Sequence, residues 1–312
     1  MTRKRRLVHA TFLLLLPVIV AWLGVSPATA VLLVLVMLLW RWLIVLSGII
    51  APEKTAAMEL ETMALSHFVE KVRWCMDRLD IDYTERQSAG TLGVFFTGRT
   101  VPLLRVRTGI VQTSIGNSPD ILRYLWGRYF ASHGAAAEFL EPTTERLALE
   151  QKLDRYGRYL QVWFYAHALN DRQLTLHAWG AGNPQIPGWQ RLALHILFPL
   201  LAALIRRSFA LSDTQYAKAV AAVEELLGNL DLALADGRRS ILGGDTINYT
   251  DITFAAFSGL WLQPPTYAGG KAEGFLIRPE RMPAAMRGDI DRWTEDYPLA
   301  VGLVSRLYAQ ER

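Results

Sequence analysis

The first fifty residues contain two long apolar runs, Leu7–Val25 and Val31–Ile50, of nineteen and twenty residues. Only the turn-rich segment Ser26–Ala30 separates them. A helix of this length is about long enough to cross a hydrocarbon core of roughly 30 Å. The pattern therefore predicts a membrane anchor over residues 1–57, in which two transmembrane helices form a hairpin and a short polar linker follows.

The basic cluster Arg3–Arg6 predicts a cytoplasmic N-terminus, because positive charge is retained on the cytoplasmic side. Two crossings return the chain to the same side, so the residues from 51 onward are expected in the cytoplasm. The alternative is a cleaved signal peptide, because Ala28-Thr29-Ala30 fits a small-residue cleavage site. We favour the hairpin, because a second apolar span follows at once and the first run is longer than a usual signal core.

Arg41 interrupts the second run at its middle, between two tryptophans. A charge at the centre of a membrane helix costs about 2.5–3.5 kcal/mol on translocon scales. Either Arg41 meets an intramembrane partner or an oligomer contact, or its side chain extends to the membrane interface. Neither run contains an acidic residue that could pair with it, which favours the second explanation.

Between residues 58 and 130 the pattern predicts an α/β domain, because short β-like runs alternate with helical periodicity. Ser118, Pro119 and Asp120 together form a strong helix-start signal. The predicted elements are, in order, strand Glu59–Met63, helix Phe68–Leu79, strand Asp82–Arg86, at best one short helix within Ser88–Thr100, strands Leu103–Val106 and Ile110–Thr113, and a helix from Ser118.

From residue 131 to 312 the pattern is helical, without convincing strand alternation, and it predicts an all-helical second domain. Thr144–Leu169 carries an aromatic stripe that most simply forms core. Trp179–Trp189 is a loop rich in glycine and proline. The apolar stretch Leu192–Ile205 is too short to cross a membrane and is expected to be a buried helix, kinked at Pro199.

Charge and cysteine content narrow the functional classes. The net charge is +4, and the first fifty residues alone contribute +5, so residues 51–312 sum to −1. The globular part therefore has no basic excess for nucleic acid, and none is expected as a partner. Cys75 is the only cysteine, which excludes an intramolecular disulfide. The six histidines show no paired ligand spacing, so no metal site is expected.

Three short segments in the α/β region carry candidate chemistry: Leu65–Trp74, Val101–Leu104 and Gly116–Leu125. In this order they resemble the glutathione-binding domain of cytosolic-type glutathione S-transferases. The resemblance covers residues 58–312 and implies a thioredoxin-like domain at 58–130 followed by an all-helical domain at 131–312.

The first segment resembles the serine-type motif Ser-Pro-Phe-x-x-Lys-Val-Arg, here beginning at Ser66. The resemblance implies that the Ser66 hydroxyl contacts the thiol of glutathione, whose deprotonation makes it nucleophilic. A plain helix N-cap is the alternative role. His67 replaces the usual proline and is expected to face solvent. Val69 stands where members that form mixed disulfides carry cysteine, so thiol exchange on the protein is not expected.

The other two segments imply the remaining glutathione contacts. Val101 and Pro102 resemble the cis-proline turn whose first residue pairs with the cysteinyl part of glutathione. Asn117 and Ser118 match an acidic-residue-serine pair that holds the γ-glutamyl end, and a helix N-terminus suits a carboxylate. Asn117 departs from the pattern, because an amide lacks the charge that attracts the ligand's ammonium group. A capped helix start without a ligand is the alternative.

The second domain adds two features to the resemblance. The segment Leu242–Ile252 resembles the capping-box signature of the family, with Asn248 as N-cap and Asp251 as its partner. The long helix at Thr144–Leu169 corresponds to one that lines the electrophile pocket. The resemblance thus implies pocket roles for Tyr156, Tyr159 and Trp163.

These features predict a membrane-anchored glutathione transferase of the detoxification type. Glutathione is the expected co-substrate, an apolar small-molecule electrophile and the lipid bilayer are expected partners, and a homodimer is possible in such a family. The alternative is a non-catalytic glutathione-transferase-like binding or scaffold module at the membrane. His67 and Asn117, the two departures from the family pattern, favour this alternative.

Overall fold

The computed structural model describes residues 24, 26–50, 56–63, 65–89, 92, 101–108 and 111–312. The Arg3–Arg6 cluster and nearly all of the first apolar run lie outside the described residues, as does most of Ser88–Thr100. The chain divides into two compact units. The first takes in the described residues up to Glu59 together with Asp82–Thr84 and Leu104–Ile115, and the second holds Leu60–Ile81, Glu85–Leu103 and Gly116–Arg312.

The first unit contains helix α2, Pro27–Ile50, which includes the second predicted span. Its start is capped by Ser26, whose Oγ accepts a hydrogen bond from Thr29 N. Many apolar side chains of α2 are exposed, among them Leu35 at 56%, Trp40 at 62% and Trp42 at 61%, whereas Leu33, Val34 and Met37 are half-buried.

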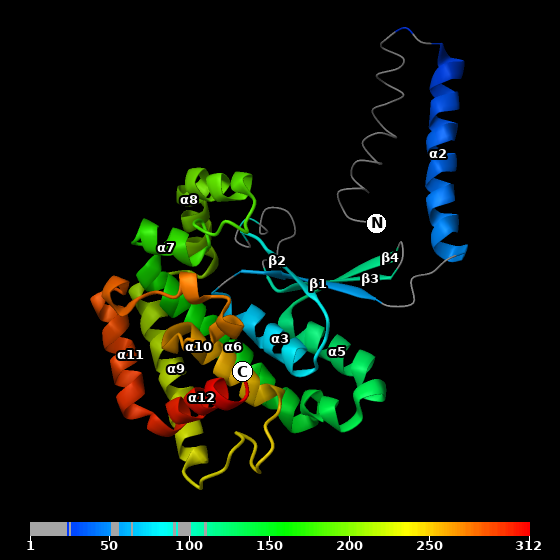
Figure 1. Cartoon of the computed structure of the whole chain (residues 1–312). Helices are drawn as coiled ribbons and strands as arrows, with labels where there is room; N and C mark the ends of the chain where they lie inside the picture. Colours follow the sequence, from blue (N-terminus) through cyan, green and yellow to red (C-terminus); the bar gives the residue numbers. More distant parts are fainter. Residues whose placement is uncertain are drawn as a thin grey trace. The chain divides into compact units, whose positions relative to one another are not determined.

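Four strands form one sheet in the order β2-β1-β3-β4. Their bounds are β1 Ala57–Thr62, β2 Thr84–Gln87, β3 Leu103–Thr108 and β4 Val111–Gly116. Along the chain they alternate with helices α3, His67–Arg78, and α5, Ser118–His133. Strand, helix, strand, then a hairpin and a helix is the order of a thioredoxin-like fold, so the predicted element order is confirmed among the described residues (Figure 1).

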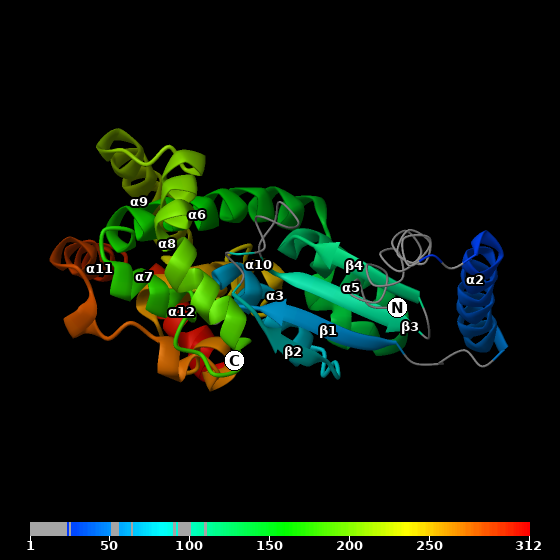
Figure 2. The same ribbon diagram turned by 90° about the horizontal axis from the view of Figure 1, so that it is seen from above.

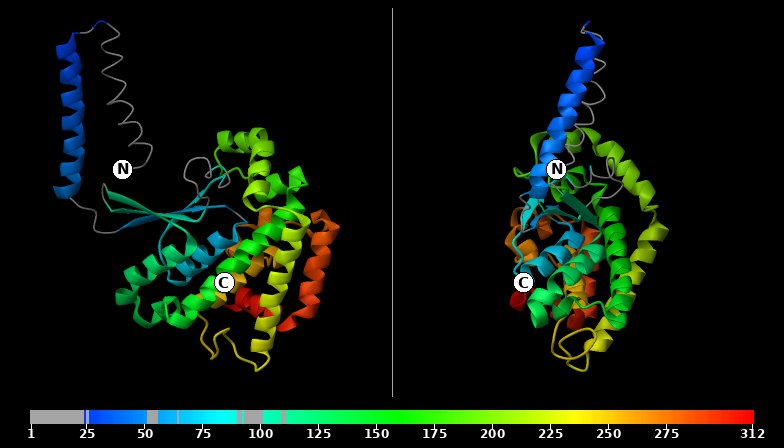
Figure 3. Two further views of the ribbon diagram at one scale, coloured as in Figure 1. Left: turned by 180° about the vertical axis from the view of Figure 1, so that it is seen from behind. Right: turned by 90° about the vertical axis from the view of Figure 1, so that its right-hand side faces the viewer.

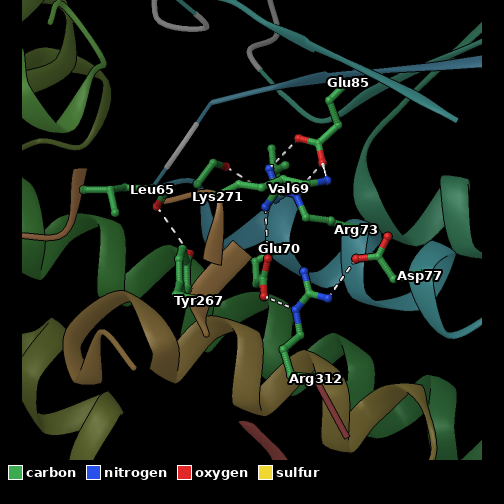
Figure 4. A network of polar contacts seen from close by, with 10 residues as sticks. Leu65, Val69, Glu70, Arg73, Asp77, Glu85, Tyr267, Lys271 and Arg312 are labelled. Atoms are coloured by element: carbon green, nitrogen blue, oxygen red, sulfur yellow. Dashed lines mark hydrogen bonds and ion pairs between the residues drawn. The ribbon is translucent and has the colours of Figure 1, made fainter. Parts of the chain in front are cut away.

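Helix α3 is buried on nearly every side, including its charged residues. Arg73 is fully buried and bonds Glu70 and Glu85 at 3.0 Å each. Arg312 reaches the same helix from the C-terminal segment and bonds Glu70 through Nε at 2.8 Å and Asp77 through an Nη atom at 2.8 Å (Figure 4). A buried charge is tolerated only when it is paired in this way.

The remaining elements of the second unit are helical. They are η2 Gly134–Leu140, α6 Thr144–Ala168, α7 Arg172–Ala178, α8 Gly188–Ser208, α9 Asp213–Leu234, α10 Tyr249–Leu262, η3 Tyr267–Gly270, η4 Glu273–Phe275, η5 Pro279–Arg281, α11 Ala284–Asp296 and α12 Pro298–Gln310. No strand is present among residues 117–312, which the structure describes throughout.

Helix α10 is the most deeply buried of these, with every residue from Tyr249 to Trp261 buried. It packs against α3, α6 and α12, while α6 also packs along α9 (Figures 1 and 3). Helix α3 in turn lies against α5 (Figure 2). Helices α3 and α5, which carry candidate glutathione contacts, therefore pack against each other, and α3 also packs against α10.

Helix α8 differs from the sequence prediction of a buried helix. Only four of its residues are buried: Leu194, Phe198, Leu201 and Ala202. They join a core cluster with Trp179 and Ile186, while the opposite side of the helix is exposed. Its apolar character therefore exceeds what burial in the domain requires. Among the described residues, α8 is also the one helix that is long and apolar enough to cross a membrane, judged by length and composition alone. The apolar segment Pro27–Leu43 of α2 is too short to meet the same length requirement.

Candidate functional site

Ser66 stands directly before α3 and is its N-cap, with extended backbone at φ −76° and ψ 111°. The Ser66 oxygen accepts a long hydrogen bond of 3.4 Å from Val69 N. Accepting this bond uses an oxygen lone pair and leaves the hydroxyl proton able to donate elsewhere. The same side chain can thus cap the helix and donate to a thiolate, so the two roles are compatible.

His67 is buried, with 3% of its surface exposed, so the expectation that it faces solvent is wrong. Its Nε2 lies 3.1 Å from the carbonyl oxygen of Gly157 on α6. The ring also packs against Phe68 and Phe257, with centroids 4.4 and 5.0 Å away. Burial lowers the pKa of His67 to about 4, and the bond to Gly157 only partly opposes this shift. At neutral pH the imidazole is therefore uncharged and fastens α3 to α6.

The Val101–Pro102 peptide bond is cis, as the resemblance implies. Pro102 is buried, Val101 is half-buried, and strand β3 begins at the next residue. The turn thus has the backbone form of the expected site. The role of Val101 in holding glutathione stays a prediction.

The start of α5 combines an unusual backbone with an unsatisfied hydroxyl. Asn117, and not Ser118 as the sequence suggested, is the N-cap residue, and it has φ 74° and ψ 127° without a side-chain capping bond. A non-glycine residue at positive φ is strained, and such strain is often kept at functional positions. The amide nitrogen of Asn117 instead donates to Asp120 Oδ2 at 3.2 Å.

Ser118 is only 1% exposed, and its Oγ has no hydrogen-bond partner among the described residues. A buried hydroxyl without a partner costs free energy, so such groups are rare in folded proteins. At the first position of a sixteen-residue helix, this hydroxyl lies where the backbone favours an anion. The arrangement is suited to a carboxylate.

One carboxylate, that of Glu150 on α6, joins the helices on which the candidate site depends. Its Oε1 lies 2.8 Å from Lys71 Nζ on α3. Its Oε2 accepts from Arg123 of α5 and, at 3.5 Å, from Tyr249 OH of α10. Four helices therefore converge on Glu150, which is 4% exposed. The sequence showed Lys71 within its motif but offered no means of identifying Glu150, seventy-nine positions away, as its partner.

Of the three residues predicted for the electrophile pocket, two are buried within the helical domain. Tyr156 is buried, with its OH 2.9 Å from Ser258 Oγ, and burial raises its pKa to about 12. Trp163 is buried and donates to Asp289 at 2.9 Å. Both belong to the core of the helical domain, the simpler alternative for this stripe, while Tyr159 is half-buried.

The face of α6 that meets α3 carries other residues. Lys71 contacts Glu150 and lies 3.7 Å from Asp154, and Gly157 contacts His67. These positions recur at helical spacing, and successive residues differ by about 100° around the axis. Gly157 therefore faces α3, whereas the neighbouring Tyr156 points into the interior of the helical domain. Gly157 also permits close approach, because a Cβ there would lie 2.8 Å from Phe257.

Two further sequence expectations concern reactive groups. Cys75 is buried, and burial raises the pKa of its thiol to about 12, which disfavours the thiolate. No group of three or more histidine, cysteine, aspartate or glutamate side chains is arranged to hold a metal among the residues that the structure describes.

Comparison with known proteins finds likeness in solved structures only. No protein-family model matches the sequence, and no curated protein matches it. A glutathione S-transferase from Methylobacterium radiotolerans in complex with glutathione sulfonate is 16% identical, with 81% of this chain and 91% of that chain covered and a TM-score of 0.49.

Two further structures are similar at the same level. A glutathione transferase family member from Pseudomonas fluorescens with two glutathione bound is 16% identical, covers 81% of this chain and 89% of its own, and has a TM-score of 0.47. A theta class glutathione S-transferase from Xanthomonas axonopodis pv. citri with glutathione bound is 19% identical, with coverages of 80% and 97% and a TM-score of 0.35. At these identities and scores the likeness assigns neither a ligand nor an activity to this chain.

Proposed function

We propose that this protein is a membrane-anchored glutathione transferase that conjugates glutathione to apolar electrophiles. The observation that carries the proposal is the Ser118 hydroxyl, which is buried at the start of α5 and has no partner among the described residues. A ligand carboxylate at this helix start would satisfy it and would be stabilised by the helix dipole. The γ-glutamyl end of glutathione carries such a carboxylate.

The ammonium group beside that carboxylate requires an acceptor. Because the Asn117 nitrogen donates to Asp120, the Asn117 amide oxygen is directed elsewhere and can accept from the ammonium group. Asp120, in the first turn of α5, adds negative charge at the same helix start. Asn117 stands where the family pattern has an acidic residue, and its amide carries no charge. In this proposal the carboxylate of Asp120 supplies the negative charge that attracts the ammonium group.

Ser66 would stabilise the thiolate. Its oxygen accepts from Val69 N, so its hydroxyl proton can donate to sulfur, and the N-terminal dipole of α3 favours the same charge. The thiol releases its proton to solvent, the thiolate forms a bond to the electrophilic carbon, and the leaving group departs with its electron pair. Val101 and Pro102 would hold the cysteinyl part of the tripeptide.

The electrophile would occupy space beside the face of α6 that meets α3. Asp154 and Gly157 lie on that face, whereas Tyr156 and Trp163 support the helix from the interior. Tyr159 stays a candidate for the pocket because it is half-buried. An apolar electrophile partitions into membranes, which gives a membrane-bound enzyme direct access to its substrate.

The membrane attachment would come from the hairpin of two apolar runs, of which α2 contains the second. Its exposed apolar side chains suit a hydrocarbon environment. With a cytoplasmic N-terminus the second unit would face the cytoplasm. A homodimer of the second unit belongs to this proposal as well.

The second candidate function is a non-catalytic binding or scaffold module at the membrane. It is favoured by the use of Ser66 as an N-cap with only 8% of its surface exposed. In that case α3 needs Ser66 for stability, and the serine has no role toward a thiol.

A titration and an activity assay on the full chain in lipid nanodiscs separate the two candidates. We expect saturable heat on adding glutathione, and conjugation of chlorodinitrobenzene that is lost in Ser66→Ala at nearly unchanged glutathione affinity. Ser212→Ala is the matched control, because Ser212 caps α9 in the same way, accepting from Gln215 N at 3.2 Å. Absence of heat at millimolar glutathione would overturn the proposal, whereas binding with equal turnover in wild type and Ser66→Ala would remove Ser66 from catalysis.

A further inference from the structure

Helix α8 has two apolar faces, and the domain uses only one of them. The inner face packs Leu194, Phe198 and Leu201 into the core cluster that contains Trp179. This packing places one face of α8 in the core of the second unit. Its remaining apolar surface needs another explanation.

The outer face is a continuous exposed stripe. Trp189, Leu192, Ile196 and Leu200 are exposed at 61%, 60%, 66% and 50%. Their spacing of three, four and four residues places them on one side of the helix. Four large apolar side chains gathered in this way differ from the scattered exposed residues of an ordinary surface and mark an interaction surface.

The segment that carries this stripe has charge of one sign, although the exposed Asp171 and Asp213 directly flank it. Residues 172–212, which comprise α7, the loop after it and α8, contain four arginines and neither aspartate nor glutamate. Residues 51–312 sum to −1, so the rest of the globular part carries −5. Arg206 and Arg207 lie in the last turn of α8 and are exposed. The apolar stripe thus lies in a long segment of the globular part in which every fully charged side chain is basic.

We propose that the outer face of α8 docks on the surface of a bilayer that contains anionic lipid. Tryptophan and leucine on one face with arginine beside them is the composition of interfacial helices, and tryptophan favours the headgroup level. The arginines attract anionic headgroups. Only residues 51–56 separate α2 from β1, so a chain anchored by α2 stays near the bilayer surface. The inference extends the proposed membrane attachment but can fail separately from it.

Depth-dependent fluorescence quenching in the full chain tests the proposal. Leu192→Cys is labelled with an environment-sensitive dye and reconstituted in vesicles with anionic lipid and nitroxide-labelled lipid. Leu232→Cys on α9, where Leu232 is 78% exposed, is the matched control. The wild type is the labelling blank, because Cys75 is buried and its pKa is raised to about 12. We expect lipid quenching several-fold stronger at position 192 than at 232.

Arg207→Glu in the Leu192→Cys background sharpens the test. It removes one basic charge and adds an acidic one, and each charge near an anionic surface changes the docking equilibrium constant by about fivefold. The two charge steps together lower that constant by about 25-fold, so lipid quenching at position 192 should fall to the level of the control. Quenching of labelled Leu192→Cys without the second substitution should also fall in purely zwitterionic vesicles.

Two results would overturn the proposal. Equal lipid quenching at positions 192 and 232 would show that α8 does not reach the bilayer. Protection of position 192 from aqueous iodide without lipid quenching would show that protein, such as a second copy of this chain, covers the face. Resistance of the full chain to carbonate extraction from membranes tests the hairpin independently, so loss of the anchor and loss of the docking face are distinguished.

Discussion

The starts of α5 and α10 share the pattern Asn-x-x-Asp but differ in the side-chain hydrogen bonds that the pattern makes. At α10, Asn248 accepts from Thr250 N at 2.9 Å, and Asp251 accepts from Asn248 N at 2.8 Å. At α5, Asn117 has positive φ, makes no capping bond, and donates to Asp120. The first start satisfies its own donors, and the second leaves the buried Ser118 hydroxyl unpaired among the described residues.

This difference separates a folding element from a candidate binding site. The α10 start is buried, and Asp251 there also accepts from Ser240 Oγ at 2.8 Å and Ile241 N at 2.7 Å. A ligand would have no donor left to use. The α5 start retains both its helix dipole and an unused hydroxyl, which are the features that bind an anion. The same local sequence signal therefore supports stability at α10, whereas at α5 our proposal gives it a role in recognition.

The largest loss of stability is expected when the hydrogen bonds at the start of α10 are removed. Asp251→Ala removes an acceptor used by two backbone N–H groups and one hydroxyl, so these buried donors lose their partner. We expect the free energy of unfolding to fall by about 3–5 kcal/mol, measured by denaturant titration of the full chain in detergent. Asp245→Ala, at an exposed position of the same loop, should change stability by less than about 0.5 kcal/mol. Equal loss in both variants would contradict the assignment.

A third helix start, that of α3, adds a pH dependence to the comparison. The pKa of His67 is about 4 in the folded protein against 6.5 for an exposed histidine. Between these values the unfolded chain binds more protons, so stability rises with pH. We expect about 3 kcal/mol to be lost as the pH falls from 6.5 to 4.

His67→Gln isolates this contribution, because glutamine can donate to Gly157 but does not titrate. The difference in unfolding free energy between wild type and His67→Gln should change with pH across this range and level off above it. Parallel stability curves would show that His67 is not the titrating group.

Ser118→Ala and Asn248→Ala should have opposite profiles. Removal of the Ser118 hydroxyl should weaken glutathione binding about tenfold, roughly 1.4 kcal/mol, with little loss of stability, because that hydroxyl has no protein partner among the described residues. Asn248→Ala should lower stability by about 1–2 kcal/mol and leave glutathione affinity unchanged. Calorimetric titration and denaturation of both variants check the pair. A large stability loss in Ser118→Ala would mean that the hydroxyl serves the fold.

The smallest expected effect concerns the strained backbone of Asn117. Glycine adopts φ 74° without a Cβ clash, so Asn117→Gly should raise the free energy of unfolding by about 0.5–1 kcal/mol. Asn248→Gly, at a residue with φ −132°, should not stabilise the protein. If Asn117→Gly is no more stable than the wild type, the backbone of Asn117 is not strained.

Much of the architecture follows from the sequence alone. Period-2 and period-3.6 patterns predicted the strand and helix order of the α/β region and the helical character of residues 131–312, because local periodicity reflects which side of an element is buried. The α10 capping box of Asn248 and Asp251 was expected from the resemblance of Leu242–Ile252 to the family signature, and the structure confirms it. The cis turn at Val101–Pro102 was implied by the resemblance, not by any local pattern.

Contacts between distant segments were decided only by the tertiary structure. Which helix covers which side of α3 and α6 decides the burial of His67, the partners of Glu150 and the direction of Tyr156. A one-residue step around a helix turns a side chain by about 100°. The aromatic stripe of α6 correctly predicted that this side of the helix is buried, but it did not predict which helix covers it. Likewise, the sequence shows that α5 starts at an Asn-Ser pair, whereas only the fold buries Ser118 without a partner. Local bonds are encoded locally, and the pairing of buried charges and hydroxyls is determined by packing.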